Sequence, residues 1–151
     1  MKRNYWKAWK AIPVAFLLTA CATVPMTSET LDTAGKSFSV PPDKANIYVV
    51  RTSALGSAVL IELIFDGKNV GSLATKTYHL LTVEPGQHTV AVSTLEGRGH
   101  VILNAEVGES YFLDAEPEMG WISAKVSIRM LGKEEGHKKV LAAKRAETLP
   151  F

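Results

Sequence analysis

Apolar and polar residues alternate, or apolar residues run together in short blocks, over most of the chain after residue 44. The blocks are rich in valine, isoleucine and tyrosine, and glycine-containing turns separate them, which is typical of β-strands. The pattern predicts strands at 45–51, 59–65, 70–74, 77–83, 88–95, 100–107, 111–116 and 121–130. Short strands at near-regular spacing indicate an all-β fold with a single β-sandwich.

The pair of strands at 77–83 and 88–95 carries the clearest turn signal. Pro85-Gly86 lies between them, and this dipeptide suits the central positions of a type II turn. A reversal there would place Leu81 opposite Val90, with both side chains on the core face. The sequence therefore predicts that these two strands pair as a hairpin.

The periodicity changes at the C-terminal end. In residues 133–147 the acidic pair Glu134 and Glu135 comes early and the basic residues Lys138, Lys139, Lys144 and Arg145 come later, which suits the dipole of a helix. Gly136 lowers the helix propensity, and Pro150 limits where the helix can end. We expect a C-terminal helix that lies on the surface of the sandwich, in preference to a helix that binds a partner.

The first 20 residues have a different pattern, with a basic start and then an apolar run. Four basic side chains and no acidic one precede the run at 11–18, as in a secretory signal peptide. The run is shorter than the roughly 20 residues that a membrane-spanning helix needs. The sequence therefore predicts a signal peptide over residues 1–20.

This leader ends in Leu18-Thr19-Ala20-Cys21, which resembles a bacterial lipobox, and Cys21 is the single cysteine of the chain. The resemblance implies cleavage between Ala20 and Cys21, a diacylglycerol on the thiol and usually an acylated amino terminus. Two or three acyl chains give stable membrane attachment. In Gram-negative lipoproteins that this resembles, aspartate after the cysteine marks retention, so Ala22 favours the outer membrane, facing the periplasm.

Without the leader, 13 basic residues remain against 15 acidic ones, because four of the 17 basic residues lie in it. A slightly acidic mature chain offers no electrostatic case for nucleic acid. The lipidated N-terminus at 21–44 is rich in Thr, Ser and Pro, and it is expected to be a flexible, extended tether. Residues 45–151 are enough for one domain with one core.

Several short motifs of this domain resemble a known pattern: 47–51 (IYVVR), Asp66-Gly67-Lys68 and 83–88 (VEPGQH). They are similar to small bacterial lipoproteins that carry an uncharacterised conserved domain, and to the PEGA-type surface domain. Glu84-Pro85-Gly86-Gln87 stands where that domain has its Pro-Glu-Gly-Ala motif. The resemblance implies a β-sandwich of transthyretin-like or immunoglobulin-like type and no activity.

Three alternating acidic residues, Asp114, Glu116 and Glu118, form the first candidate site, beside Trp121. On an extended backbone they would share one side, and oxygen-rich clusters suit calcium. The spacing lacks the glycine-centred calcium loop, and alternating acids are typical of the exposed face of a strand. Ion binding at these residues stays open.

The four histidines are expected at the rim or surface and not as metal ligands. His79 and His88 would share a face, but about four residues along a hairpin separate them by roughly 13 Å. His100 and His137 have no assignable neighbour, and no spacing is typical of zinc. The sequence predicts no metal and no cofactor.

Catalytic signals are equally sparse. The chain has no Gly-x-Ser-x-Gly motif, and its single thiol is assigned to lipid. Tyr48, Arg51 and Trp121 could line a ligand groove, although capping of the sandwich is favoured.

The sequence therefore predicts a lipoprotein of the cell envelope that is not an enzyme, with a binding or structural role. Its partners would be membrane lipid, through acylated Cys21, and either another envelope protein or peptidoglycan. A small-ligand or glycan-binding module is the alternative, and an envelope hydrolase is third.

Overall fold

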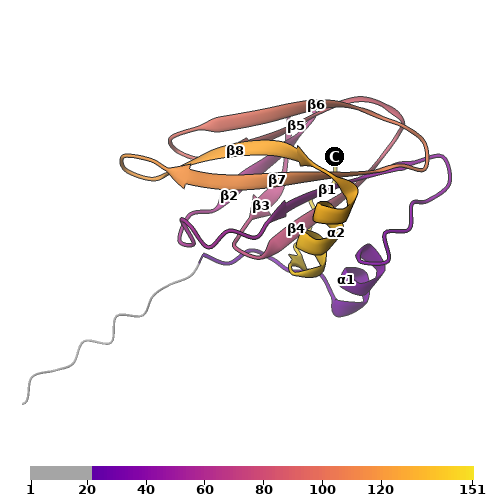
Figure 1. The fold of residues 1–151 in the computed structure, drawn as a ribbon, viewed down its shortest axis with the longest axis horizontal. Helices are drawn as coiled ribbons and strands as arrows, with labels where there is room; N and C mark the ends of the chain where they lie inside the picture. Colours follow the sequence, from indigo (N-terminus) through magenta and orange to yellow (C-terminus); the bar gives the residue numbers. More distant parts are fainter. Residues whose placement is uncertain (1–21) are drawn as a thin grey trace, which may run out of the picture.

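A computed structural model describes residues 22–151, which form two stacked β-sheets with two helices on the outer face of one of them (Figure 1). The predicted all-β sandwich with a C-terminal helix is confirmed. The strands are β1 (Ala45–Arg51), β2 (Ile61–Phe65), β3 (Lys68–Leu73), β4 (Thr77–Val83), β5 (Gly86–Ser93), β6 (Arg98–Ala105), β7 (Ser110–Met119), β8 (Ala124–Leu131) and β9 (Lys144–Arg145). The helices are α1 (Glu29–Gly35) and α2 (Lys133–Leu141).

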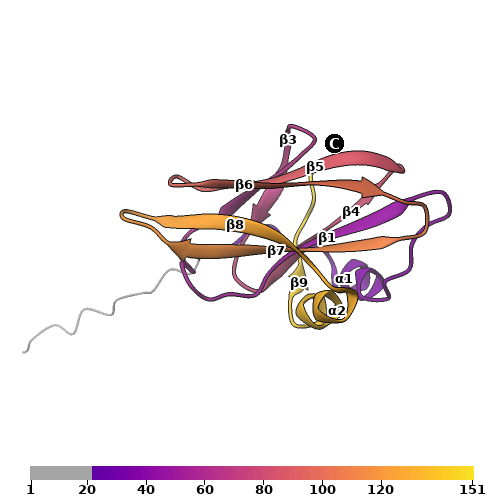
Figure 2. The same ribbon diagram turned by 45° about the horizontal axis from the view of Figure 1, so that its top comes forward.

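The first sheet has the order β8-β7-β1-β4-β9, and the second has the order β3-β2-β5-β6. In the first sheet β1 is central, parallel to β7 and antiparallel to β4. Every residue of β1 is buried, because the second sheet covers one face and the helices cover the other. Figure 2 shows α1 and α2 together on the side of the first sheet that faces away from the second.

Two apolar clusters follow from this layering. Branched aliphatic side chains from both sheets fill the space between them. Aromatic side chains dominate the second cluster, which lies between the first sheet and α2. Its buried members are Tyr48, Val50, Tyr78, Phe112, Leu131, Val140 and Ala143.

The predicted pairing of the fourth and fifth strands is wrong. β4 pairs with β1, where Leu81 lies opposite Ile47, whereas β5 pairs with β2 and β6 in the other sheet. Leu81 and Val90 are both buried in the core, as expected, but they come from opposite sheets. The alternation of a strand determines which side chains face inward, and it does not determine the neighbouring strand.

The segment before β1 also differs from the expected flexible tether. Ser28 caps α1, since its hydroxyl accepts a hydrogen bond from the amide of Leu31. The amide of Thr27 donates to the carbonyl of Arg145, and Met26 forms a bridge with Ala146 beside β9. Most of this segment is thus folded onto the C-terminal end of the domain.

Buried hydroxyl groups and one aromatic side chain, Phe38, which packs against the second apolar cluster, contribute to this docking. Tyr48 donates to the carbonyl of Gly35 at 2.9 Å, and Tyr78 donates to the carbonyl of Asp32 at 3.2 Å. A side chain at Gly35 would lie 2.6 Å from the Tyr78 hydroxyl oxygen, so glycine allows the close approach. Leu31, by contrast, is half exposed.

The C-terminal helix is shorter than the periodicity predicts. α2 ends at Leu141, and Lys144 and Arg145 then run parallel to β4 as its edge partner. The open edge of β4 offers backbone hydrogen bonds to residues 144–146, and these bonds replace the ones that a longer helix would form. Gly136 is buried where this helix packs on β7. A Cβ atom there would lie 2.2 Å from Cγ of Phe112, so only glycine fits.

Candidate functional site

The predicted acidic cluster is an ion-pair network. Asp114 is buried, and its carboxylate contacts Lys139 and, at 3.2 Å, Arg129. Arg129 also contacts Glu116 at 3.3 Å and Glu135 of α2 at 3.1 Å. These basic side chains occupy the positions that a cation would need, and they tie α2 to β7 and β8.

The structure therefore brings together Asp114 and Glu116, two of the three predicted carboxylates. It adds Glu135, which the sequence pattern did not indicate. Glu118 lies farther along β7, opposite Lys125. Burial raises the pKa of the Asp114 carboxyl, whereas the hydrogen bond with Asp114 lowers the pKa of Glu116. Within residues 22–151 no group of three or more His, Cys, Asp or Glu side chains is arranged to hold a metal ion.

His79 is fully buried, so its expected position at the rim or surface is wrong. It has the same strand parity as Leu81 and therefore faces inward. Its Nδ1 lies 3.0 Å from the Thr148 hydroxyl, and its Nε2 lies 3.0 Å from the carbonyl of Ser72. Burial lowers the pKa of this imidazole, which favours the neutral ring. Gly71 makes room for it, because a Cβ atom there would lie 2.6 Å from its Cε1 atom.

Two further histidines have structural partners. Nδ1 of His88 lies 2.7 Å from a carboxylate oxygen of Asp66. The ring of His137 stacks on Phe38 with a centroid distance of 3.9 Å. Neither arrangement resembles a metal site.

Arg51 and Tyr48 neither line a groove nor cap the sandwich, because both are fully buried. Tyr48 packs in the aromatic cluster below the first sheet. The guanidinium of Arg51 donates to the carbonyls of Val59 at 2.7 Å, Leu73 at 3.2 Å, Leu55 at 3.0 Å and Gly56 at 2.9 Å. Burial lowers the pKa of Arg51, and these bonds hold the loop between β1 and β2 against β3.

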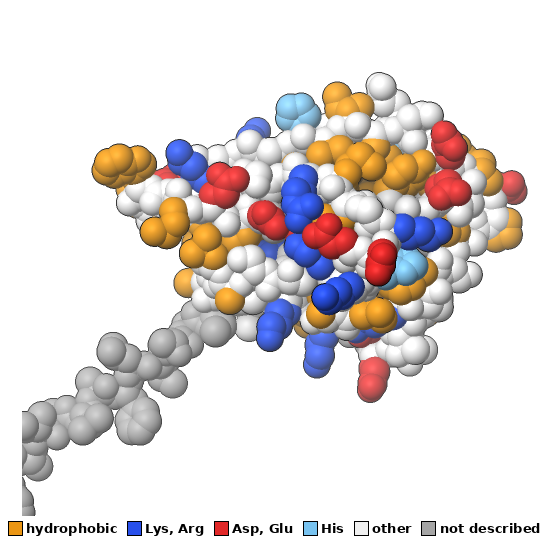
Figure 3. All heavy atoms as spheres, viewed as in Figure 1, with side chains coloured by type: hydrophobic (Ala, Val, Ile, Leu, Met, Phe, Trp, Pro, Cys, Tyr) orange, Lys and Arg blue, Asp and Glu red, His pale blue; other side chains and the backbone are white. Residues whose placement is uncertain are grey.

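Four large apolar side chains at one end of the sandwich are exposed to more than 80%. They are Leu95 at 94%, Met119 at 81%, Trp121 at 96% and Ile122 at 95%, and we call them the apolar tip. Leu95 lies in the β5–β6 turn, Met119 is the last residue of β7, and Trp121 and Ile122 lie in the β7–β8 turn. Figure 3 shows hydrophobic side chains standing clear of the body of the molecule at the left, where the β7–β8 hairpin ends. Isolated exposed apolar residues are ordinary, whereas a group of this kind marks an interaction surface.

A carboxylate holds the backbone of the tip. One oxygen of Glu96 accepts from the amide of Trp121 at 2.8 Å, and the other accepts from the amide of Ile122 at 2.6 Å. Gly120 permits this contact, since a Cβ atom there would lie 1.9 Å from the same carboxylate. The two turns are thus linked, while the apolar side chains point into solvent.

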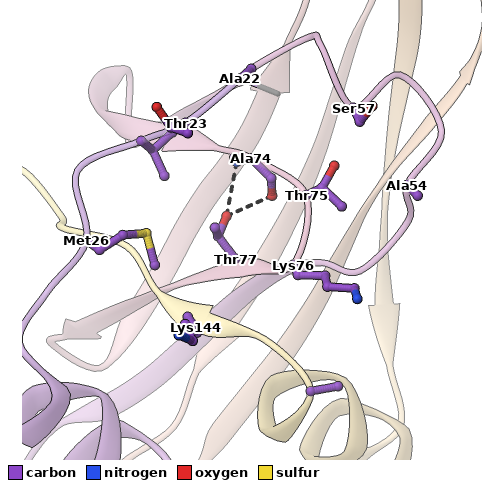
Figure 4. Close-up of a pocket in the computed structure, with 12 residues that line it drawn as sticks. Ala22, Thr23, Met26, Ala54, Ser57, Ala74, Thr75, Lys76, Thr77 and Lys144 are labelled. Atoms are coloured by element: carbon purple, nitrogen blue, oxygen red, sulfur yellow. Dashed lines mark hydrogen bonds between the residues drawn. The ribbon is translucent and has the colours of Figure 1, made fainter. Parts of the chain in front are cut away.

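A groove of about 760 Å³ lies near the start of the described chain, and we call it the N-terminal groove (Figure 4). Its lining residues are Ala22, Thr23, Val24, Met26, Ala54, Ser57, Ala74, Thr75, Lys76, Thr77, Ala142 and Lys144. The hydroxyl of Thr77 bonds with the backbone of Ala74. The hydroxyl oxygen of Thr75 is buried and has no hydrogen-bond partner among the described residues.

The loop after β1 connects these features. The amide of Ala22 donates to the carbonyl of Ser57 at 3.4 Å. Leu55 and Gly56 of the same loop line a small hollow together with residues 118–124, at the end of the β7–β8 hairpin. The start of the described chain, the N-terminal groove and the apolar tip therefore lie around the same loop. Figures 1 and 2 show the start of the described chain and the turn between β7 and β8 on the same side of the sandwich.

The predicted cleavage and lipidation positions, Ala20 and Cys21, lie outside the described residues. Within residues 22–151, neither helix has the length and apolar character needed to cross a bilayer.

The chain folds as a two-sheet β-sandwich, and its sequence belongs to a family whose function is not established. The chain belongs to the family described as "Protein of unknown function (DUF2846)", whose sequence pattern matches residues 41–127. An uncharacterized protein of Haemophilus influenzae (strain ATCC 51907 / DSM 11121 / KW20 / Rd) is 30% identical over 131 residues, which cover 85% of this chain and 77% of that protein. No solved structure matches. The expected uncharacterised conserved domain is confirmed, whereas the resemblance to PEGA-type domains stays a prediction.

Proposed function

We propose that this protein is a non-catalytic lipoprotein of the bacterial cell envelope, anchored through acylated Cys21 to the outer membrane and facing the periplasm. The observation that supports it most is the position of Ala22. This residue follows the lipobox directly, and it is bonded to the loop between β1 and β2 at the end of the sandwich that carries the apolar tip.

The folded N-terminal segment changes how such an anchor would work. An extended tether of residues 22–44 could reach roughly 75 Å at about 3.3 Å per residue. Instead, Met26 is already bridged to Ala146, and Ala22 contacts Ser57. An anchor at Cys21 would therefore hold the sandwich directly against the bilayer.

A binding or structural role agrees with the use of the buried polar groups. Arg51 bonds to backbone carbonyls, His79 bonds to Thr148 and Ser72, and Asp114 is paired with basic side chains. Each of these groups stabilises the fold. Another envelope protein or peptidoglycan would then bind the surfaces that point away from the membrane.

The anchor is tested by the change Cys21→Ser in the natural host. We expect the unchanged protein to fractionate with membranes and to show acyl groups on Cys21 by mass spectrometry, and the variant to stay uncleaved or to become soluble. Thr23→Ser keeps the thiol and serves as the matched control. A bare Cys21 in the natural product would refute the anchor.

The N-terminal groove supports a second candidate, a module that binds a small apolar ligand. Its volume lies within the range of small-molecule sites, and most of the surface that its walls expose is apolar. Thr, Ser and Lys residues make up half of the lining, so polar groups of a ligand would also find partners there.

A fluorescent fatty acid is a suitable probe for this groove. We expect saturable binding that Ala54→Phe abolishes by filling the groove, whereas Ile102→Ala, on the outer face of β6, leaves it unchanged. Equal binding by both variants would exclude the groove as a ligand site.

A further inference from the structure

We propose that the apolar tip inserts into the interfacial layer of a lipid bilayer and forms a second membrane contact. This inference rests on the proposed lipid anchor, because Ala22 places the anchor at the end of the sandwich that carries the tip. A protein held at Cys21 and at the tip would have one preferred orientation, with this end towards the membrane.

The composition of the tip fits the interface between headgroups and acyl chains. Trp121 combines a large apolar ring with an N–H donor, and such side chains concentrate at membrane surfaces. Met119, Ile122 and Leu95 add apolar area around it, and all four side chains lie largely in water in the unbound protein. Transfer of this area from water into lipid is favourable.

Two backbone amides of the tip already have hydrogen-bond partners before the tip would leave water. An amide that enters an apolar layer without a partner is costly, and hairpin turns often leave amides unpaired. Here both carboxylate oxygens of Glu96 are used, one on the amide of Trp121 and one on the amide of Ile122. The turn is also ordered before it binds, so insertion loses little conformational entropy.

The charged groups near the tip do not oppose an anionic surface. Glu118 lies opposite Lys125 on neighbouring strands, and Glu96 is engaged by two amides. Arg98 at the base of the β5–β6 turn and Lys125 can extend their charged ends towards lipid phosphates while their stems remain in apolar surroundings. Two acidic side chains, Glu96 and Glu118, and two basic ones, Arg98 and Lys125, lie near the tip, so these groups give it no net negative charge.

Trp121 offers a direct probe of insertion, because Trp6 and Trp9 belong to the predicted leader and Trp121 is the remaining tryptophan of the mature chain. The mature acylated protein is reconstituted into phosphatidylethanolamine and phosphatidylglycerol vesicles with brominated chains. We expect a blue-shifted emission, quenching by bromine and protection from iodide. Emission typical of water, with full access to iodide, would overturn the insertion.

The change Ile122→Asp should abolish the blue shift and the bromine quenching. The side chain of Ile122 is 95% exposed, so this variant is expected to fold normally. Ile102→Asp is the matched control, because Ile102 is 57% exposed on β6 and lies outside the tip. Equal quenching in both variants would contradict the proposal.

Flotation of the vesicles separates the anchor from the tip. A protein that floats while Trp121 stays accessible to iodide keeps the anchor and overturns the tip inference. If the natural protein carries no acyl groups, the unacylated protein is titrated with the same vesicles: a blue shift supports the tip, and an unchanged emission overturns it. A blue shift without vesicles that grows with protein concentration identifies a second copy as the occupant and also overturns the lipid contact.

Discussion

Arg51 is the residue on which the loop between β1 and β2 depends. A buried guanidinium keeps its charge only where hydrogen bonds replace water, and four backbone carbonyls do so here. The side chain is thus a structural clamp for the loop that lines the N-terminal groove and reaches the apolar tip.

The change Arg51→Met should lower the free energy of unfolding by about 3 kcal/mol, because hydrogen bonds to a charged group are lost and buried carbonyls remain unpaired. Urea unfolding followed by circular dichroism measures the loss. Arg98→Met, at an exposed position, should change the value by less than about 0.5 kcal/mol. Similar losses in both variants would show that the clamp has no special role.

The buried His79 makes stability depend on pH. Its pKa in the folded state is lowered by burial, so the unfolded chain takes up a proton first as the pH falls through about 6.5. Its contribution to stability is therefore present at higher pH and is lost as the pH falls. His88 acts in the opposite direction, because burial lowers its pKa but the bonds with Asp66 and the Glu84 carbonyl outweigh this and raise it.

A His88→Gln background isolates the effect of His79. In that background we expect the free energy of unfolding to fall between about pH 7.5 and pH 5, and a second change, His79→Gln, to reduce this fall. Urea titrations across the range measure both slopes. Identical slopes would mean that His79 does not titrate differently in the folded state.

At the scale of elements, α2 shows that helix propensity and packing can conflict. Gly136 is a poor helix former in solution, yet Phe112 of β7 occupies the space that a larger side chain would need. The aromatic ring packs against the helix backbone, and the ion pairs of Asp114 with Lys139 and Arg129 fasten the same contact.

The change Gly136→Ala should destabilise the protein by about 1–3 kcal/mol, although alanine is the better helix former by about 1 kcal/mol, because the new methyl group overlaps Phe112. Thermal unfolding checks this. Gly132→Ser provides the contrast: a Cβ atom there has no neighbour within 4 Å, and serine at this N-cap should raise stability by about 0.3 kcal/mol. A more stable Gly136→Ala protein would contradict the packing argument.

At the scale of the whole molecule, the N-terminal segment would set the orientation of the sandwich under the proposed anchor at Cys21. α1 rests on the hydroxyl groups of Tyr48 and Tyr78, and Arg145 donates to Leu31 and to the Asp32 carboxylate. Before α1, Met26 is bridged to Ala146 and Ala22 is bonded to Ser57, so Ala22 lies at the end of the sandwich that carries the apolar tip.

The change Tyr78→Phe should loosen this docking by about 1 kcal/mol, because one buried hydrogen bond is lost without a change of ring size. Hydrogen exchange in α1 should become faster, while the amides of β1 and β4 keep their protection. Thr82→Val removes a part-buried hydroxyl on the same strand and serves as the control. Unchanged exchange in α1 would show that the segment is held by other contacts.

Local chemistry along the chain was enough to establish the β-sandwich, most of its strands and the surface helix. Side-chain alternation and turn residues depend on near neighbours, so β1 and the burial of Leu81 and Val90 followed directly from the sequence. The lipobox at Cys21 is likewise a linear motif, and it stays a prediction about the anchor.

Tertiary structure alone decided the pairing of β4 with β1, the docking of residues 22–44, the burial of Arg51 and His79, and the apolar tip. Each depends on groups far apart in the sequence that meet only after folding, such as Glu96 with Trp121, or Gly136 with Phe112. Strand alternation says which way a side chain points, and the partner it meets is determined by the packing of the whole chain.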